Sequence, residues 1–303
     1  MAADAVSADV DFDARIDERE AELQLLKSLM GDTKAFAELE KREWSEPGVA
    51  GAYARGFSKA SDIVVPHLVA AVDAGPDTDA LDLCCGHGNV TADLVAAGAR
   101  VIGLDFSAAM LELARAAVPG ARFVAGNAMQ LSFRDASFDA VTIGFGIPHV
   151  PEPPRVLAEA RRVLRPGGRI AFSTWCGPEV DGALGYVFGA IGSHGSPHIV
   201  LPPGPGANDY ADPEIAYPVL EAAGFGGFRC EVVASSWQVD DPGLAFDFFR
   251  DGTARGGALL RPQPEAHARA IRAAVVERVL ENHGEGPEWT VPMPAVVISA
   301  RAI

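Results

Sequence analysis

Leu81-Asp82-Leu83-Cys84-Cys85-Gly86-His87-Gly88-Asn89, residues 81–89, is the stretch that decides the fold. An apolar run that ends in a glycine-rich turn and opens a helical pattern is typical of the first strand–turn–helix unit of an open α/β sheet. Gly86 and Gly88 lack side chains, so the backbone can bend tightly there and lie against a ligand. Such sheets bind ligands at the carboxyl ends of their strands, so we expect a binding site at this turn.

An acidic residue after the next apolar run adds to this site. Asp105 follows Val101–Leu104, and a carboxylate there can accept hydrogen bonds from both hydroxyls of an adenosine ribose. Thr91 stands where dinucleotide-binding turns have a third glycine, and Asp82 places a negative charge before the turn. That charge suits a cationic amino-acid moiety better than a pyrophosphate. The pattern favours S-adenosylmethionine and leaves a nicotinamide cofactor as the alternative.

From about residue 63, apolar runs alternate with helical periods, which predicts strand–helix units and a mostly parallel sheet. The predicted strands are 79–84, 100–104, 122–125, 138–143 and 169–175, and the predicted helices are 62–73, 89–97, 107–117 and 154–164. Further on we expect a covering loop over 176–212 around a short helix near 183–192, helices 213–223, 241–251 and 263–283, a strand 228–237, and a last strand 293–301 antiparallel to it. Upstream, the pattern indicates a loose tail over 1–12, an amphipathic helix over about 16–30, and a short helix carrying Phe36 and Leu39 toward Trp44 before a turn at Ser45–Gly48.

The amino-acid composition and net charge disfavour some classes of binding partner. The 303 residues are 49% hydrophobic and 22% charged, a globular balance, and 25 Lys+Arg against 41 Asp+Glu give a net charge of −16. Such an acidic chain disfavours nucleic acid and anionic membrane surfaces as partners. The four cysteines lack paired spacing, the N-terminus is acidic, and no apolar run approaches the roughly 18 residues of a membrane span. These features predict a soluble cytoplasmic protein.

Five sequence blocks in a fixed order indicate more specifically which ligand the site binds. They are LDLCCGHGNVT (81–91), VIGLDFSAAML (101–111), GNAMQLSF (126–133), FDAVTIGFGIPHV (138–150) and EARRVLRPGGRIAFSTW (159–175). Over about residues 50–175 the chain resembles class I S-adenosylmethionine-dependent methyltransferases, most of all the ubiquinone/menaquinone biosynthesis C-methyltransferase family. The resemblance implies a Rossmann-like α/β fold, a mostly parallel seven-stranded sheet with helices on both faces. Together with the elements predicted on either side, we expect a helical N-terminal cap (1–60), a cofactor-binding core (61–175) and a C-terminal part (176–303) that completes the sheet and carries a substrate lid, all in one structural domain.

The resemblance also assigns the cofactor site. It places Asp82, Gly86, His87 and Gly88 around the methionine part of S-adenosylmethionine, with Cys84 in the same turn. Asp105 holds the ribose, and Gly144 contacts the cofactor. The adenine lies against Phe106 and the segment Asn127-Ala128-Met129. Tyr53 matches an aromatic residue that closes over the cofactor in many relatives.

The acceptor is less determined. Pro148-His149 replaces the Arg-Asn pair that is usual in the quinone family, and the chain after residue 176 is longer than in that family. These are the elements that recognise the acceptor. Fold and cofactor therefore carry over better than substrate. We expect C- or O-methylation of a small aromatic, quinone-like or polyketide-like molecule. The alternatives are N-methylation of a small metabolite, an NAD(P)-dependent oxidoreductase, and a non-catalytic cofactor-binding partner. A homodimer stays open.

His149 is the candidate general base. It follows the fourth predicted strand at the ligand edge, and an unperturbed imidazole with a pKa of about 6.5 can take a proton at neutral pH. In the alternative interpretation it only caps a helix or shapes the pocket, because position and desolvation alone can promote methyl transfer. His194 and His198 could instead supply the base or bind a metal. Two histidines without a carboxylate make a weak metal site, so we expect no metal.

We interpret Cys84 and Cys85 as small buried residues. The aromatic residues read as core or pocket wall: Trp175, Trp237, Trp289, Phe246, Phe248 and Phe249.

Overall fold

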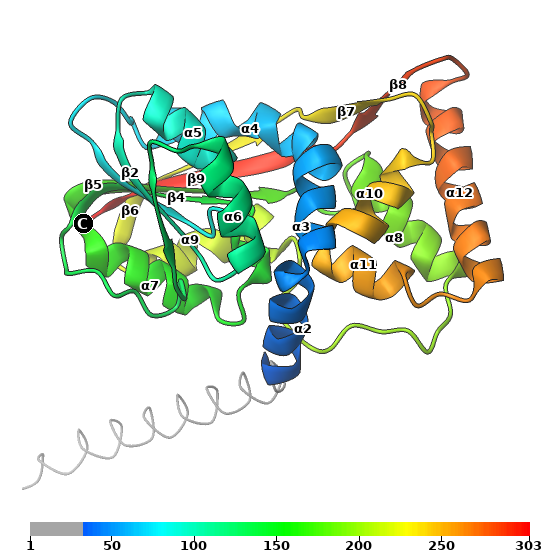
Figure 1. Cartoon of the computed structure of the whole chain (residues 1–303), viewed down its shortest axis with the longest axis horizontal. Helices are drawn as coiled ribbons and strands as arrows, with labels where there is room; N and C mark the ends of the chain where they lie inside the picture. Colours follow the sequence, from blue (N-terminus) through cyan, green and yellow to red (C-terminus); the bar gives the residue numbers. More distant parts are fainter. Residues whose placement is uncertain (1–32) are drawn as a thin grey trace, which may run out of the picture.

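Seven strands form one sheet in the order β3-β2-β1-β4-β5-β9-β6, seen edge-on at the left of Figure 1. The computed structural model describes residues 33–303. The strands of this sheet are β1 (Asp79–Leu83), β2 (Arg100–Asp105), β3 (Arg122–Ala125), β4 (Phe138–Gly144), β5 (Leu164–Trp175), β6 (Phe225–Val233) and β9 (Ala295–Ala302). Strands β1 to β5 pair in parallel, and β9 runs antiparallel to both β5 and β6. The predicted α/β fold with a mostly parallel seven-stranded sheet is confirmed.

Helices cover both faces of the sheet, and they are α4 (Ser58–Ala71), α5 (Asn89–Ala96), α6 (Ala108–Ala117), α7 (Pro153–Val163) and α9 (Pro213–Ala222). Successive side chains of a strand point to opposite faces. In β1, Ala80 therefore packs in the cluster of α4 and α5, whereas Leu81 and Leu83 pack in the cluster of α7 and α9. All three are fully buried, as expected for a central parallel strand.

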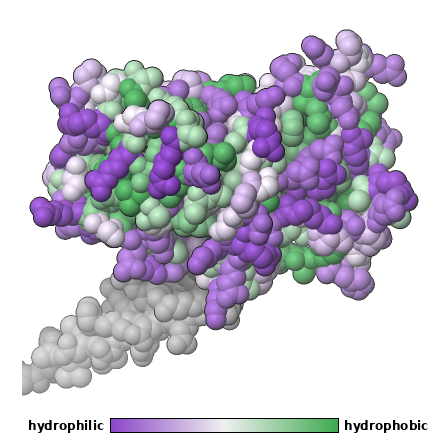
Figure 2. All heavy atoms as spheres, in the orientation of Figure 1, coloured by the Kyte–Doolittle hydropathy of each residue, from purple (hydrophilic) through white to green (hydrophobic). Residues whose placement is uncertain are grey.

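A third hydrophobic cluster lies beyond the end of the sheet, on the right of Figure 1. We call the elements that build it the C-terminal helical part: α8 (Ala183–His194), α10 (Leu244–Gly252), α11 (Ala254–Leu260), α12 (Glu265–His283) and the two-stranded sheet of β7 (Ser236–Val239) and β8 (Trp289–Pro292). Trp237 is its largest fully buried side chain. In Figure 2, hydrophilic side chains are spread over the visible face of both parts of the molecule, with hydrophobic atoms between them.

The N-terminal elements run between the sheet and the C-terminal helical part (Figure 1). They are α2 (Thr33–Ser45), α3 (Pro47–Ala52) and the π-helix η1 (Tyr53–Phe57). Two one-turn 3₁₀ helices, η2 (Ile147–His149) and η3 (Asp209–Ala211), interrupt the connections after β4 and before α9. Among the described helices, none has the length and apolarity that a membrane span requires.

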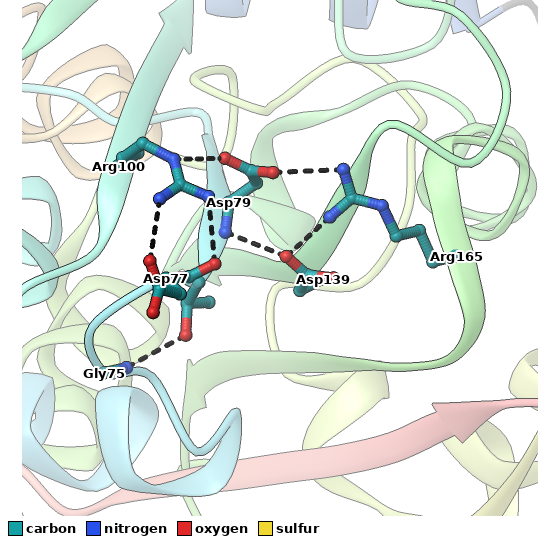
Figure 3. A network of polar contacts seen from close by, with 7 residues as sticks. Gly75, Asp77, Asp79, Arg100, Asp139 and Arg165 are labelled. Carbon is teal, nitrogen blue, oxygen red and sulfur yellow. Dashed lines mark hydrogen bonds and ion pairs between the residues drawn. The ribbon is translucent and has the colours of Figure 1, made fainter.

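Ion pairs brace the amino ends of the central strands (Figure 3). Asp79 at the start of β1 accepts hydrogen bonds from Arg100 Nε at 2.7 Å and from Arg165 Nη2 at 3.0 Å. Arg165 also pairs with Asp139 of β4 at 2.6 Å, and Asp139 Oδ2 accepts from the Asp79 amide at 2.9 Å. This network lies at the edge of the sheet opposite to the carboxyl ends.

Several predicted boundaries need correction. The predicted strand 228–237 is two strands, because the chain leaves the seven-stranded sheet after Val233 and enters the two-stranded sheet at Ser236. The predicted last strand 293–301 corresponds to β9, and a separate short strand, β8, precedes it. Strand β5 begins at Leu164 rather than 169, and the predicted turn at Ser45–Gly48 becomes the start of α3 at Pro47. The predicted helix over 16–30 lies outside the described residues.

Candidate functional site

A cavity of about 600 Å³ opens at the carboxyl ends of β1, β2 and β4, where the sequence predicts the ligand site. Its walls come from the glycine turn, the ends of these strands and the N-terminal helices. We call it the first cavity, and it is lined by Trp44, Tyr53, Cys84, Cys85, Gly86, His87, Asn89, Asp105, Phe106, Met110, Gly144, Phe145, Gly146, His149 and Val150.

The glycine turn uses left-handed backbone, which glycine adopts without strain. Gly86 has φ +54° and Gly88 has φ +90°, and the Gly88 amide donates to the Cys85 carbonyl at 2.9 Å. A Cβ added to Gly86 would have no atom within 4 Å, so this side of the turn faces open space in the cavity. A Cβ on Gly88 would meet Ala114 of α6 at 3.2 Å. Gly86 therefore leaves room for a ligand, and Gly88 lets the turn pack on α6.

Asp105 is held rigidly at the cavity wall by backbone amides. Its Oδ2 accepts from the Gly86 amide at 2.9 Å and its Oδ1 from the Ser107 amide at 2.8 Å. Burial raises the pKa of the Asp105 carboxyl, while these amide donors oppose the rise. Each carboxylate oxygen has a second lone pair, so the group can still accept hydrogen bonds from a ligand.

Asp82 lies beneath the turn and does not line the first cavity. It is fully buried, and its two oxygens accept from the hydroxyls of Thr91 at 2.6 Å and Thr142 at 3.0 Å. Burial raises the pKa of Asp82 to about 7, against the opposing effect of these two hydroxyl donors. The Thr91–Asp82 bond also accounts for a threonine at the position where dinucleotide-binding turns have glycine.

The remaining predicted cofactor residues divide into two groups. Tyr53, Cys84, His87, Phe106 and Gly144 line the first cavity, and the Phe106 side chain is 42% exposed. The others, Gly88, Asn127, Ala128 and Met129, lie outside its lining. The Asn127 Oδ1 accepts from the Met129 amide at 2.9 Å, which fixes the turn after β3.

A second cavity of about 580 Å³ adjoins the first. Trp44, Tyr53, Phe145 and His149 line both. The walls of the second cavity alone are mostly apolar and aromatic: Phe57, Pro148, Trp175, Leu184, Phe188, Ala207, Asn208, Phe249, Thr253, Arg255 and Gly256. Of the aromatic residues that the sequence offers as core or wall, Trp175 and Phe249 line this cavity, whereas Trp237 is buried in the core.

Phe145 stands at the boundary between the cavities in a strained conformation. Its φ is +55°, a region that bulky side chains rarely adopt, and its ring stacks on Trp175 with centroids 4.0 Å apart. The Ser173 hydroxyl accepts from the Phe145 amide at 3.1 Å. Such strain persists only where the surroundings hold it, and it is concentrated at functional sites.

His149 also stands at this boundary, in contact with residues that sequence reasoning missed. Its Nδ1 lies 2.9 Å from Glu40 Oε2, and its ring meets the Trp44 ring edge-on at 5.1 Å. Glu40 also accepts from Arg255 Nε at 2.9 Å. Glu40 and Trp44 sit in a charged amphipathic segment and Arg255 in a glycine-rich helix. No local motif in the sequence marks any of the three.

The thiols of the turn are not activated. Burial raises the pKa of Cys84 and of Cys85 far above the ordinary range, and the nearby carboxylates of Asp82 and Asp105 add to the rise. The two cysteines therefore serve as small side chains of the turn. Within residues 33–303, no three His, Cys, Asp or Glu side chains gather in a group that could hold a metal ion.

Comparisons with known proteins found similarity to methyltransferases. The family model of a methyltransferase domain matches residues 81–172. The demethylmenaquinone methyltransferase of Lactococcus lactis is 51% identical over 98 residues, 30% of this chain and 39% of the relative. That of Renibacterium salmoninarum is 42% identical over 111 residues, 37% of this chain and 47% of the relative, so the chain covers less than half the length of these relatives.

A solved structure shows the same fold over most of the chain. It is phosphoethanolamine N-methyltransferase 2 of Haemonchus contortus, in complex with phosphomonomethylethanolamine and S-adenosylhomocysteine. The TM-score is 0.52 at 15% identity, covering 88% of this chain and 60% of that one. The glycine turn and Asp105 lie in the segment that the family model matches, and so do all lining residues of the first cavity except Trp44 and Tyr53. Residues 81–172 of this chain are therefore the segment that is similar to methyltransferase domains.

Proposed function

We propose that this protein transfers the methyl group of S-adenosylmethionine to a small organic acceptor. The observation that carries the proposal is the pair of adjoining cavities. One is built on the glycine turn and Asp105 of the methyltransferase domain, and the other has aromatic walls. A methyl transferase for small molecules needs both a cofactor site and an acceptor site that opens onto it. A non-catalytic cofactor-binding protein needs only the first.

The first cavity fits the cofactor. Open space over Gly86 admits a ligand against the backbone, and the Asp105 carboxylate can accept the hydrogen bonds of two ribose hydroxyls. Phe106, half exposed at the rim, would lie on the adenine. The buried Asp82, with a pKa of about 7, is about half ionised at neutral pH and would supply part of a negative charge behind the turn for a cationic amino-acid moiety. When bound, S-adenosylmethionine supplies a methyl group already activated by its sulfonium.

The second cavity supports a flat or apolar acceptor. Its aromatic walls suit an aromatic, quinone-like or polyketide-like molecule, methylated at carbon or oxygen, and the curated relatives are named for such a quinone-type acceptor. Aligning two reactants in adjoining sites can contribute an effective molarity of about 10⁵ M or more. His149, which lines both cavities, would accept the proton that the acceptor releases. The net charge of −16 also supports a small molecule over a nucleic acid as partner.

Ligand-dependent stability tests the cofactor directly. Saturating S-adenosylhomocysteine should raise the thermal unfolding midpoint and give a measurable calorimetric affinity, because a ligand that binds only the folded state stabilises it. NADH and NADPH serve as matched controls and should leave the midpoint unchanged. Stabilisation by a nicotinamide cofactor alone would replace this proposal by the oxidoreductase alternative.

A further inference from the structure

We propose that Glu40 is a positioning residue, which holds His149 in the tautomer and orientation that let its Nε2 take a proton from the acceptor. This inference rests on the proposed function. Glu40 belongs to α2, outside the methyltransferase domain, and no motif assigns it a role.

Glu40 is a buried hydrogen-bond acceptor with three donors. Only 2% of its surface is exposed. Its Oε2 faces Trp44 Nε1 at 3.0 Å and His149 Nδ1 at 2.9 Å, and its Oε1 faces Arg255 Nε at 2.9 Å. The cluster joins α2, the turn after β4 and α11.

The charge state of Glu40 decides the tautomer of His149. Burial by itself raises the pKa of the Glu40 carboxyl, but His149 and Arg255 together outweigh burial and hold it below its ordinary value. Glu40 is thus an ionised carboxylate, which can only accept hydrogen bonds. Nδ1 must therefore carry the hydrogen, and in the neutral ring the lone pair is left on Nε2.

The ring is held so that Nε2 is available at the cavities. Its Nδ1 edge is turned to the buried Glu40, and Trp44 contacts it edge-on at 5.1 Å. The His149 side chain is 28% exposed, and it lines both cavities. A carboxylate, an indole and a short 3₁₀ turn thus fix one rotamer at the place where cofactor and acceptor meet.

The charged groups nearest to His149 come from three elements, α2, α11 and β2. Glu40 faces it from α2, and Arg255 on α11 lies beyond Glu40, whose charge it offsets. Asp105 on β2 is near enough for the His149 charge to lower its pKa. The other imidazole of the first cavity, His87, has a pKa lowered by burial and adds no positive charge at neutral pH.

The proton step balances for an acceptor with a weakly acidic hydroxyl, such as a phenol or an enol. The O–H bond breaks, and its proton goes to His149 Nε2. The oxygen electron pair forms the new bond to the methyl carbon, while the carbon–sulfur pair stays on sulfur. The imidazolium that results lies against the Glu40 carboxylate, which stabilises the developing charge without having to reorient.

Glu40→Gln tests the inference, because it keeps the size of the side chain and removes its charge. We expect kcat with a phenolic acceptor to fall about tenfold or more, with KM for both substrates within about twofold of wild type. The acid limb of the pH profile of kcat/KM should move to lower pH, since loss of a neighbouring negative charge disfavours the protonated form of a base. Glu159→Gln is the control, because Glu159 is a carboxylate paired with Arg162 away from both cavities, and its profile should match wild type.

Arg255→Gln tests the same inference in the opposite direction. Removing the cation that offsets Glu40 should move the acid limb to higher pH. Side-chain ¹H–¹⁵N correlation spectra of the protein without ligands, with His149→Gln to identify the signals, should show the Nδ1–H tautomer in wild type and its loss in Glu40→Gln.

An acid limb that stays in place in folded Glu40→Gln, or an Nε2–H tautomer in the wild type, would make Glu40 a structural brace and overturn the inference. Calorimetry of S-adenosylhomocysteine separates the two proposals: if wild type does not bind it, the proposed function fails, whereas normal binding with an unmoved limb rejects only the role of Glu40.

Discussion

Gly86 and Gly88 share the left-handed conformation, but their surroundings give them different roles. A methyl group on Gly86 would enter open space in the first cavity, and one on Gly88 would press on Ala114 Cβ at 3.2 Å and Cα at 3.3 Å. The sequence motif treats the two glycines alike. Only the packing of the turn on α6 tells them apart.

We expect Gly88→Ala to act mainly on stability and Gly86→Ala mainly on cofactor binding. Gly88→Ala should lower the free energy of unfolding by about 2–4 kcal/mol, from strain plus overpacking. Gly86→Ala should cost about 1–2 kcal/mol for the left-handed backbone and weaken S-adenosylhomocysteine binding about tenfold or more by filling its space. Urea denaturation and calorimetry on the same samples measure both. A larger loss of affinity in Gly88→Ala than in Gly86→Ala would contradict this assignment.

The residues that complete the site could be predicted only where they lie in a local pattern. Gly86 and His149 follow β1 and β4, and Asp105 is the last residue of β2, so their convergence at the carboxyl ends of the strands was predictable from the strand–helix repeat. Glu40 and Arg255 are 215 residues apart and come from helices with no site motif. Their meeting at His149 depends on how α2 and α11 pack, which periodicity does not encode.

At the scale of elements, the parallel strands could be predicted well because each is a short, buried apolar run bounded by a turn. The division of the region 228–237 into two strands could not be predicted, because apolar residues lie on both sides of the point where the chain changes sheet. Ser235 marks that change: its hydroxyl donates to the Met293 carbonyl, and its own carbonyl accepts from the Met293 amide at 2.8 Å. These partners come from the far end of the chain, so nothing nearby in the sequence signals the break.

The ion network at the amino ends of the strands makes a prediction about stability. Asp79→Asn should lower the free energy of unfolding at pH 7 by about 0.5–1 kcal/mol, a small value because the pairs with Arg100 and Arg165 are partly exposed. Asp77→Asn is the control. Asp77 is 97% exposed and has φ +71°, which asparagine tolerates, so we expect no measurable change.

The sign of the pH dependence follows from the direction of the shift. The hydrogen bond from Arg100 is the largest cause that holds the pKa of Asp79 below its ordinary value; burial opposes it, and the hydrogen bond from Arg165 adds to the lowering. A carboxyl with a lowered folded-state pKa stabilises the fold above its unfolded pKa of about 3.9 and loses this contribution as the pH falls through the folded value. The difference between wild type and Asp79→Asn should therefore be complete at neutral pH and shrink below about pH 4. A difference that grows with acidification would refute the role of the pair.

At the scale of the whole molecule, the two cavities draw their walls from different parts of the chain. The first cavity is lined mainly by residues 81–172, whereas Leu184, Phe188 and Phe249 of the C-terminal helical part close the second. We therefore propose that residues 176–303 act as the part that selects the acceptor, and that residues 61–175 bind the cofactor. Relatives that share only the methyltransferase domain need not share the acceptor.

Phe188→Ala tests this division of labour. Phe188 lies on α8 and contacts Phe249 edge-on at 5.7 Å in the second cavity. Removing its ring should raise KM for an aromatic acceptor about tenfold, because a buried aromatic contact is lost, and leave the calorimetric affinity for S-adenosylhomocysteine within about twofold of wild type. Phe228→Ala is the matched control, since Phe228 stacks on Tyr217 at 4.9 Å outside both cavities, and it should cost stability without changing KM. Equal effects of Phe188→Ala on cofactor and acceptor binding would mean that the two cavities form one undivided site.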